Sequence, residues 1–376
     1  MTSTVDRSRT RNARSQGTPF LQNISLTRKE DWGRFVDAPS RIKPDEASRA
    51  QLDGLSDTAR RQYNQLRMDW HANLGPFKTP QYKALHADLW TVVDSNLQDG
   101  DRVKGGVAVD AYPGLGKTTA VQQFARDFHL EQIAADGPRT ASGHERWPVL
   151  FTTLTGNTTL RDLNRDMLGF YAHPGSERGT STQFVRRALD CVLSCETKLF
   201  VIDDLHFLRW PSATSIQVSN HFKFIANTFP VTLVFVGVEL RNTGLLAEGR
   251  SDSSIVAQTA RRTTVLGLNK FDVTTQPERA TWRSLLTTIE QRLVLAGNGR
   301  GMLADVLPDY LYERTSGHIG SLMTLVNRGC ARAIRTGEES LSQVLLDTIP
   351  LDAAAEDTRP ENAAALRSGK LRARMR

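Results

Sequence analysis

The 376-residue chain has few cysteines and no long hydrophobic run. Its three cysteines cannot build the disulfide framework of a small secreted domain, and no histidine stands at zinc-ligand spacing from Cys191 and Cys195. No apolar run approaches the ~18 residues that a membrane span needs, and residues 1–15 lack the apolar core of a signal peptide. We therefore expect a cytoplasmic protein that makes no contact with a membrane.

Lysine is also scarce, since it supplies 10 of the 48 basic residues and arginine supplies the rest. The net charge is +7, but residues 1–15 carry +3 and residues 367–376 carry +5, so the body between them is close to neutral. Hydrophobic residues make up 39% and charged residues 24%, which is ordinary for a globular protein. An argument for nucleic-acid binding must therefore rest on local patches or on the two ends.

Residues 106–271 alternate short apolar runs with helical patterns. Runs of this kind, rich in valine, leucine and isoleucine, are typical of strands in a parallel sheet that helices cover on both faces. The sequence thus predicts an α/β fold with a parallel-sheet core over this range. The predicted strands are residues 107–111, 149–154, 199–202, 231–238 and 264–268.

The segments on either side of this core have a different composition. Residues 1–52 are polar and predict a flexible N-terminal arm. Residues 53–105 contain two amphipathic helical patterns and predict a helical N-terminal extension. Residues 272–350 predict a C-terminal all-helical lid, and residues 351–376, alanine-rich and then basic, predict a basic C-terminal tail.

The clearest chemical motif is the loop after the first strand, residues 111–119, with the sequence Ala-Tyr-Pro-Gly-Leu-Gly-Lys-Thr-Thr. It matches Gly-x4-Gly-Lys-[Ser/Thr] except for alanine at the first position, a change that removes no phosphate ligand. Gly114 and Gly116 allow a tight turn whose N–H groups face phosphate oxygens, Lys117 reaches the β- and γ-phosphates, and Thr118 binds Mg²⁺. The motif predicts ATP and Mg²⁺ as ligands. The predicted nucleotide-binding residues here are Pro113, Gly114, Leu115, Gly116, Lys117, Thr118 and Thr119.

A second motif ends the third predicted strand, where four apolar residues precede Asp203 and Asp204. The carboxyl ends of parallel strands are where nucleotides bind in open α/β sheets. We expect Asp203 to bind the nucleotide's Mg²⁺ together with Thr118, and Asp204 to orient or deprotonate the attacking water. Asp204 is shorter than the glutamate usual at this place, which favours slow hydrolysis.

Four further segments follow the pattern of a known family. They are Ile202–His206, Gln258–Arg261, Thr315–Leu322 and residues 157–169. With the order P-loop, Walker B strand, further strand, arginine and helical lid, the chain resembles an AAA+ ATPase. More narrowly, it resembles the TniB/TnsC group of transposition regulators, relatives of the Mu B protein, over roughly residues 54–350.

The resemblance implies a homo-oligomer, either a ring or a helical filament. Arg261 would be the arginine finger that reaches the γ-phosphate of a neighbouring subunit, with Arg262 as the runner-up. The alternative is an arginine pair that only solvates the start of the last strand. Ser321 stands where many AAA+ lids have a sensor arginine, so a slow, oligomer- or DNA-stimulated ATPase is expected.

Family members wrap double-stranded DNA with the segment after the second strand. Arg161 and Arg165 are spaced i, i+4 and share one helix face, but Asp162 and Asp166 offer the alternative of a solvated, paired surface. No base-reading motif is present, so binding would be independent of sequence and strongly salt-dependent. The DNA contacts implied by the resemblance are Thr158, Thr159, Arg161 and Arg165.

The function that the resemblance implies is an ATP-dependent regulator of DNA transposition. It would oligomerise on target DNA and recruit or activate a transposase, with hydrolysis driving disassembly. Its partners would be double-stranded DNA, a transposase and a target-selector protein. The alternative is a nucleotide-switch signalling ATPase that controls a partner protein without binding DNA.

Overall fold

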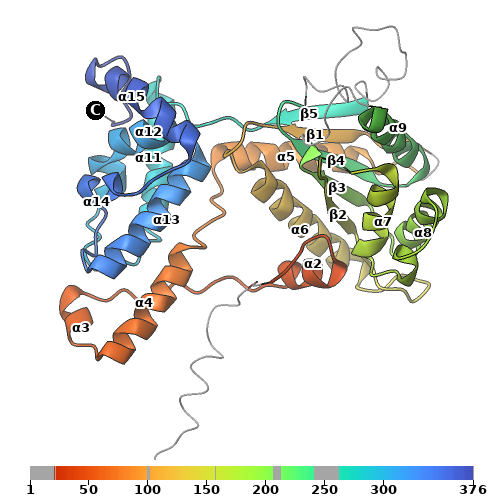
Figure 1. Ribbon diagram of the computed structural model, residues 1–376, viewed down its shortest axis with the longest axis horizontal. Helices are drawn as coiled ribbons and strands as arrows, with labels where there is room; N and C mark the ends of the chain where they lie inside the picture. The colour runs from red at the N-terminus through yellow and green to blue at the C-terminus, as the bar shows by residue number, and fades with distance from the viewer. Residues whose placement is uncertain are drawn as a thin grey trace, which may run out of the picture. The chain divides into compact units, whose positions relative to one another are not determined.

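The computed structural model describes residues 21, 23–99, 102–156, 158–205, 213–240 and 262–375. These described residues divide into two compact units, which we call the sheet unit and the helical unit (Figure 1). The sheet unit takes its described residues from 23–37 and 78–269, and the helical unit takes its described residues from 21, 38–77 and 270–375. Each unit has its own hydrophobic core.

The described part of the sheet unit contains one five-stranded sheet in the order β2-β3-β4-β1-β5, and all neighbouring strands are parallel. Every residue of β3 and of β4 is buried, as the continuous apolar runs require when both faces of a sheet are covered. The predicted parallel sheet is therefore confirmed. The strands are β1 Gly106–Asp110, β2 Val149–Thr153, β3 Leu199–Asp203, β4 Thr232–Gly237 and β5 Thr263–Gly267.

Helices flank this sheet, with α5 and α6 on one side and α7, α8 and α9 on the other (Figure 1). Apolar side chains of α6 such as Phe124 and Ala125 are fully buried in the core of the unit. Side chains that begin these helices cap them, for example Thr79 at α5 and Thr180 at α8. The helices are α5 Pro80–Ser95, α6 Lys117–Asp136, α7 Leu160–Phe170, α8 Ser181–Ser194 and α9 Ala213–Thr228, with a 3-10 turn η1 at Pro174–Ser176.

The predicted flexible arm over residues 1–52 needs correction in its second half. Residues Lys29–Val36 form helix α2 within the sheet unit. Trp32 is fully buried, donates its indole N–H to His129 Nδ1 at 3.1 Å and stacks on Phe151. Trp32 and Val36, both buried in the core of the sheet unit, thus anchor a polar segment, because burying apolar side chains outweighs the polar composition around them. Residues 1–20 and 22 lie outside the described part.

The helical unit surrounds a second core that includes the fully buried Trp282. Arg67 of α4 and Glu339 form a bidentate ion pair in this unit, with N–O distances of 2.6 and 2.9 Å. The predicted helical extension is thus split, since α4 belongs to the helical unit and α5 to the sheet unit. The helices are α3 Arg49–Asp53, α4 Asp57–His71, α11 Gln276–Glu290, α12 Pro308–Thr315, α13 Ile319–Thr336, α14 Gln343–Asp347 and α15 Ala353–Arg367, with a π-helical turn η3 at Met302–Val306.

The predicted basic tail over residues 351–376 is largely helical. Helix α15 occupies Ala353–Arg367, and beyond it the amides of Ala373 and Arg374 donate to one carboxylate oxygen of Asp309 at 2.6 and 2.8 Å. The alanine-rich part is thus a helix packed on α12. The basic part is hydrogen-bonded to Asp309 in the first turn of α12. Among the described residues, no helix is long and apolar enough to cross a membrane.

Candidate nucleotide-binding site

The loop between β1 and α6 turns tightly. β1 ends at Asp110 and α6 begins at Lys117. Gly114 and Gly116 have φ angles of +75° and +82°, in the left-handed region that other residues rarely adopt. A Cβ atom at Gly114 would meet no described atom within 4 Å, so this glycine is required by the backbone conformation and not by lack of space.

The amino end of α6 directs amide groups toward this loop. The first bond of the helix joins the Ala120 amide to the Gly116 carbonyl at 2.9 Å. The N–H groups of Lys117, Thr118 and Thr119 therefore precede the helical hydrogen-bond ladder and have no acceptor within it. Together with the positive end of the helix dipole, such groups bind phosphate oxygens.

Lys117 lies half-buried among carboxylates. Burial lowers the pKa of its ammonium, and the charges of Asp203, Asp204 and Asp110 only partly oppose this shift. Asp110 had no role in the sequence prediction. Asp110 ends β1 as Asp203 ends β3. Because the carboxyl ends of parallel strands lie at one edge of the sheet, the position of Asp110 in the sequence predicts that it lies near the P-loop.

The structure brings together Thr118 and Asp203, which are 85 residues apart in the sequence. The Thr118 hydroxyl donates to Asp203 Oδ1 at 3.4 Å, and the backbone amide of Asp204 donates to the same oxygen at 2.8 Å. The Asp203 side chain is 4% exposed, and burial raises its pKa. A hydroxyl and a buried carboxylate side by side are the oxygen ligands that Mg²⁺ prefers beside phosphate groups.

Asp204 follows β3 with a left-handed backbone, at φ +58°. Aspartate and asparagine tolerate this region better than most residues because their short polar side chains bond locally. The turn directs the chain away from β3 directly after Asp203, which places two carboxylates in succession at the carboxyl edge of the sheet.

Residues 101–244 match the family model described as "AAA domain". This range includes the P-loop, β2, β3 and β4, and the AAA domain therefore contains every site residue so far described. No curated protein matches the sequence significantly.

Solved structures resemble the chain beyond the AAA domain. The Aeropyrum pernix ORC1 protein in complex with DNA aligns with a TM-score of 0.54 and 15% identity, covering 78% of this chain and 68% of that one. The Aeropyrum pernix ORC2 protein, solved as ADPNP-ADP complexes, aligns with a TM-score of 0.51 and 12% identity, covering 72% of this chain and 67% of that one. At such identities the likeness establishes the fold, the AAA+ P-loop NTPase fold with a helical C-terminal region.

The predicted arginine finger, Arg261, lies outside the described residues, as does His206. Arg262, the runner-up, is described and exposed. It stands directly before β5 and donates to Asn227 Oδ1 at 3.1 Å. Its position places it at the amino edge of the sheet, whereas the P-loop lies at the carboxyl edge.

The predicted DNA contacts at α7 are engaged within the chain. Thr158 is 5% exposed and accepts the Thr155 amide at 2.8 Å, while Thr159 caps α7 and donates to Asp162 at 2.7 Å. Arg165 pairs with Asp162 at 3.3 Å and also approaches Asp166. Arg161 donates to the Gly179 carbonyl at 3.3 Å and lies over the Phe184 ring.

Ser321, at the place of a sensor arginine, has a packing role in the helical unit. Its hydroxyl donates to Asp352 Oδ2 at 2.7 Å, and Asp352 caps the first turn of α15. The side chain is mostly buried, at 7% exposure for the residue. This serine therefore fixes the start of α15 on α13.

Proposed function

We propose that this protein binds ATP with Mg²⁺ and hydrolyses it slowly. The observation that carries the proposal is the meeting of the Thr118 hydroxyl and the Asp203 carboxylate beside Lys117, at the amino end of α6. The AAA domain match supports the same conclusion, because this geometry lies within it.

The P-loop and Asp203 share the proposed binding of the phosphates and of Mg²⁺. The backbone N–H groups of residues 114–119 and the Lys117 ammonium would hold the phosphates, with Pro113 shaping the loop. Thr118 and Asp203 would hold Mg²⁺, which would supply positive charge against the phosphates. Among the described residues, no group of three or more His, Cys, Asp or Glu side chains could hold a metal. A site of one hydroxyl and one carboxylate fits Mg²⁺, which keeps waters and takes its other ligands from phosphate.

Hydrolysis would use Asp204 on the attacking water and an arginine from a second copy of the chain. We propose Arg261 for the second role, in a homo-oligomeric ring or filament. An arginine supplied by a neighbour makes turnover depend on assembly, because the charge that stabilises the transition state is absent from the monomer.

The finer proposal is regulation of DNA transposition. We infer that ATP promotes assembly on duplex DNA, that the assembly recruits a transposase together with a target-selector protein, and that hydrolysis disassembles it. The TniB/TnsC-like segments support this proposal, among them Ile202–His206 and Thr315–Leu322. A DNA contact at α7 would require Thr159 and Arg165 to exchange their bonds with Asp162 for bonds with phosphate.

Gel mobility shifts on duplex DNA with ATP, ADP and a slowly hydrolysed analogue test this proposal. We expect a shift with ATP and the analogue that ADP does not support, and no shift with the Lys117→Ala variant. Binding that ignores the nucleotide would contradict the ATP-dependent assembly, and no binding would contradict the DNA part. A transposase gene of the integrase fold beside this gene would support the partner, and purified transposase should then co-sediment with the ATP-bound assembly.

A second candidate is a nucleotide switch that controls a partner protein without DNA. The internal bonds of Thr158, Thr159, Arg161 and Arg165 favour it, because they already satisfy the groups that would contact DNA. Tightly retained ADP, negligible turnover and no stimulation by DNA would distinguish this candidate from the first.

A further inference from the structure

A cleft in the sheet unit lies at the amino ends of β1 and β5, away from the P-loop. The two strands are parallel, and Gly106 of β1 pairs with Thr263 of β5. This register places the segment before β1, with Arg102 and Lys104, next to the segment before β5, with Arg262. The sequence does not show this meeting, because the two segments are about 160 residues apart.

Two adjoining hollows make up the cleft. The larger, of about 570 Å³, is lined by Arg102, Lys104 and Arg262 with the hydroxyl residues Thr263 and Thr264. The smaller, of about 40 Å³, shares Lys104 and Arg262 and reaches α9, where Lys223 and Asn227 line it. None of the described residues that line either hollow is acidic.

Arg102, Lys104 and Arg262 have no carboxylate partner among the described residues. Arg262 donates to the neutral amide of Asn227, and Lys104 donates to the backbone carbonyls of Gln98 and Asp99. Within the described residues, no carboxylate comes within 4.0 Å of the charged groups of Arg102, Lys104 or Arg262. Their charge is therefore available to an anion from outside.

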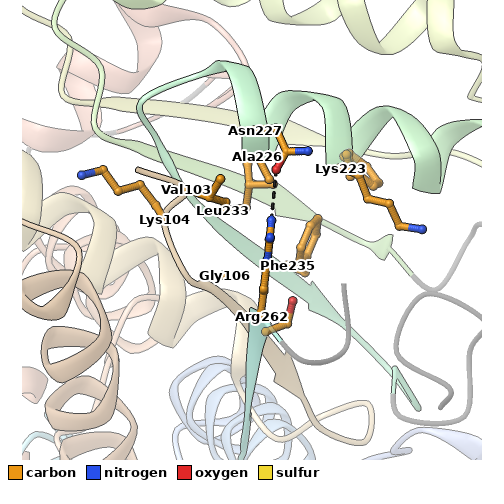
Figure 2. A pocket seen from close by; sticks show the side chains of 11 residues that line it. Val103, Lys104, Gly106, Lys223, Ala226, Asn227, Leu233, Phe235 and Arg262 are labelled. Atoms are coloured by element: carbon orange, nitrogen blue, oxygen red, sulfur yellow. Dashed lines mark hydrogen bonds between the residues drawn. The ribbon is translucent and has the colours of Figure 1, made fainter. Parts of the chain in front are cut away.

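The arrangement of the cations indicates the shape of that anion. Figure 2 shows Arg262 between Lys104 and Lys223, whose side chains extend away from it to either side. Donors that converge on one point suit a single phosphate, whereas donors spread along a groove suit a row of phosphates. A nucleotide bound in the protomer's own P-loop cannot supply the phosphate for this cleft. The cleft lies at the amino end of β1 and the P-loop at its carboxyl end, and the strand separates them by about 13 Å.

We propose that this cleft binds the phosphodiester backbone of duplex DNA, with Arg102, Lys104 and Arg262 as the phosphate contacts and Thr264 as a hydroxyl donor. The contacts lie on backbone phosphates, so they position DNA without reading its sequence. This inference rests on the DNA part of the proposed function and names the surface that carries it.

The test removes two charges without touching Arg262, whose neighbour Arg261 has a proposed role in hydrolysis. The variant is Arg102→Gln/Lys104→Gln, and the matched control is Arg139→Gln/Arg186→Gln, which removes two exposed arginines elsewhere in the sheet unit. Affinity for a fluorescent duplex is measured by anisotropy between 50 and 200 mM salt, in the presence of the slowly hydrolysed analogue.

Log affinity falls as log salt rises, and the loss of two phosphate contacts makes this slope less steep by about 1.8. Over this fourfold change in salt, the wild type should lose about 12-fold more affinity than the cleft variant. The control variant should keep the wild-type slope, and Lys104→Arg, which keeps the charge, should keep it too. Thermal melting of each variant verifies that it is folded.

A cleft variant with the wild-type slope would overturn this inference while leaving the proposed function intact. A fall in ATP turnover without loss of DNA affinity would also overturn it, and would assign the cleft to a nucleotide on a second copy. If the wild type binds no DNA, both proposals fail in their DNA part. Cleft-dependent binding that ignores the nucleotide would uphold the inference and reject only the ATP dependence.

Discussion

Replacing Asp204 by asparagine would separate its charge from its backbone role. The residue has a left-handed backbone at φ +58°, and its amide supports Asp203 Oδ1 at 2.8 Å. Asparagine adopts this region as readily as aspartate, so Asp204→Asn removes one negative charge and leaves the turn and the Asp203 contact in place. Alanine would add strain of about 1–2 kcal/mol at the same position.

The expected effect on catalysis is large and the effect on folding small. A side chain that takes a proton from the attacking water typically contributes about 10²–10⁴-fold to the rate, which corresponds to about 3–5 kcal/mol in the activation free energy. Asp204→Asn should therefore lower ATP turnover by that factor. ATP affinity should stay near the wild-type value, because Thr118, Asp203 and the loop amides are unchanged.

The assay combines three measurements on Asp204→Asn and Asp204→Ala: phosphate release at saturating ATP, equilibrium binding of a fluorescent ATP analogue, and thermal melting. Asparagine should lower turnover by about 10²–10⁴-fold with unchanged binding and melting, and should trap the ATP-bound assembly. Alanine should lower both turnover and melting temperature. Turnover of Asp204→Asn near the wild-type rate would refute the assignment of the base, and loss of ATP binding would show that the charge serves the nucleotide instead.

Three further predictions follow from particular contacts. Lys117→Ala should abolish ATP binding measured by calorimetry, since the ammonium at the phosphates is lost, while melting of the apoprotein stays unchanged. Glu339→Gln should destabilise the helical unit by about 3–5 kcal/mol in urea unfolding, because the 1%-exposed Arg67 side chain then keeps a buried charge without its partner. Burial lowers the pKa of His71 and of His129 to about 4, and both rings accept N–H bonds that the protonated form cannot accept. Because the pKa of each ring in the folded protein lies below the ordinary value, stability should fall as pH drops from about 6.5 toward 4. The expected loss is about 2 kcal/mol per ring between pH 7 and pH 5. A free energy of urea unfolding that does not decline over this range would contradict the claim that both rings are buried in the neutral form.

The sheet could be predicted because its signal is local. Leu199–Ile202 and the run ending at Gly237 are continuous apolar segments of strand length, and such segments in a doubly covered sheet carry no competing polar pattern. The meeting of Thr118 and Asp203 followed from the same reasoning, since motifs at the carboxyl ends of parallel strands share one edge. Here local pattern and topology agree, so position along the chain translates into position in space.

The polar composition of residues 1–52 hides helix α2. Trp32, Phe35 and Val36 stand at the i, i+3, i+4 spacing of a helix face, but the burial of Trp32 against His129 and Phe151 depends on partners more than 90 residues away. The left-handed backbone of Asp204 was likewise invisible in the sequence. It lies in the same motif that identified the catalytic candidates, yet motif matching gives residue types and not backbone angles.

The DNA surface is where the structure changes the interpretation most. At α7 the hydroxyl of Thr159 and the carboxylate of Asp162 form a reciprocal capping box, so the residue types that suggested a DNA contact are the ones that begin a helix. A basic residue indicates DNA only where its charge lacks an internal partner. Arg165 has such partners in Asp162 and Asp166, whereas Arg102 and Lys104 lack a carboxylate partner among the described residues. Arg161 of α7 likewise lacks a carboxylate partner among the described residues, but it is a single cation, whereas the proposed cleft gathers three. Charge that the fold leaves uncompensated, and not the number of arginines, therefore favours the cleft over α7 as the proposed principal DNA contact.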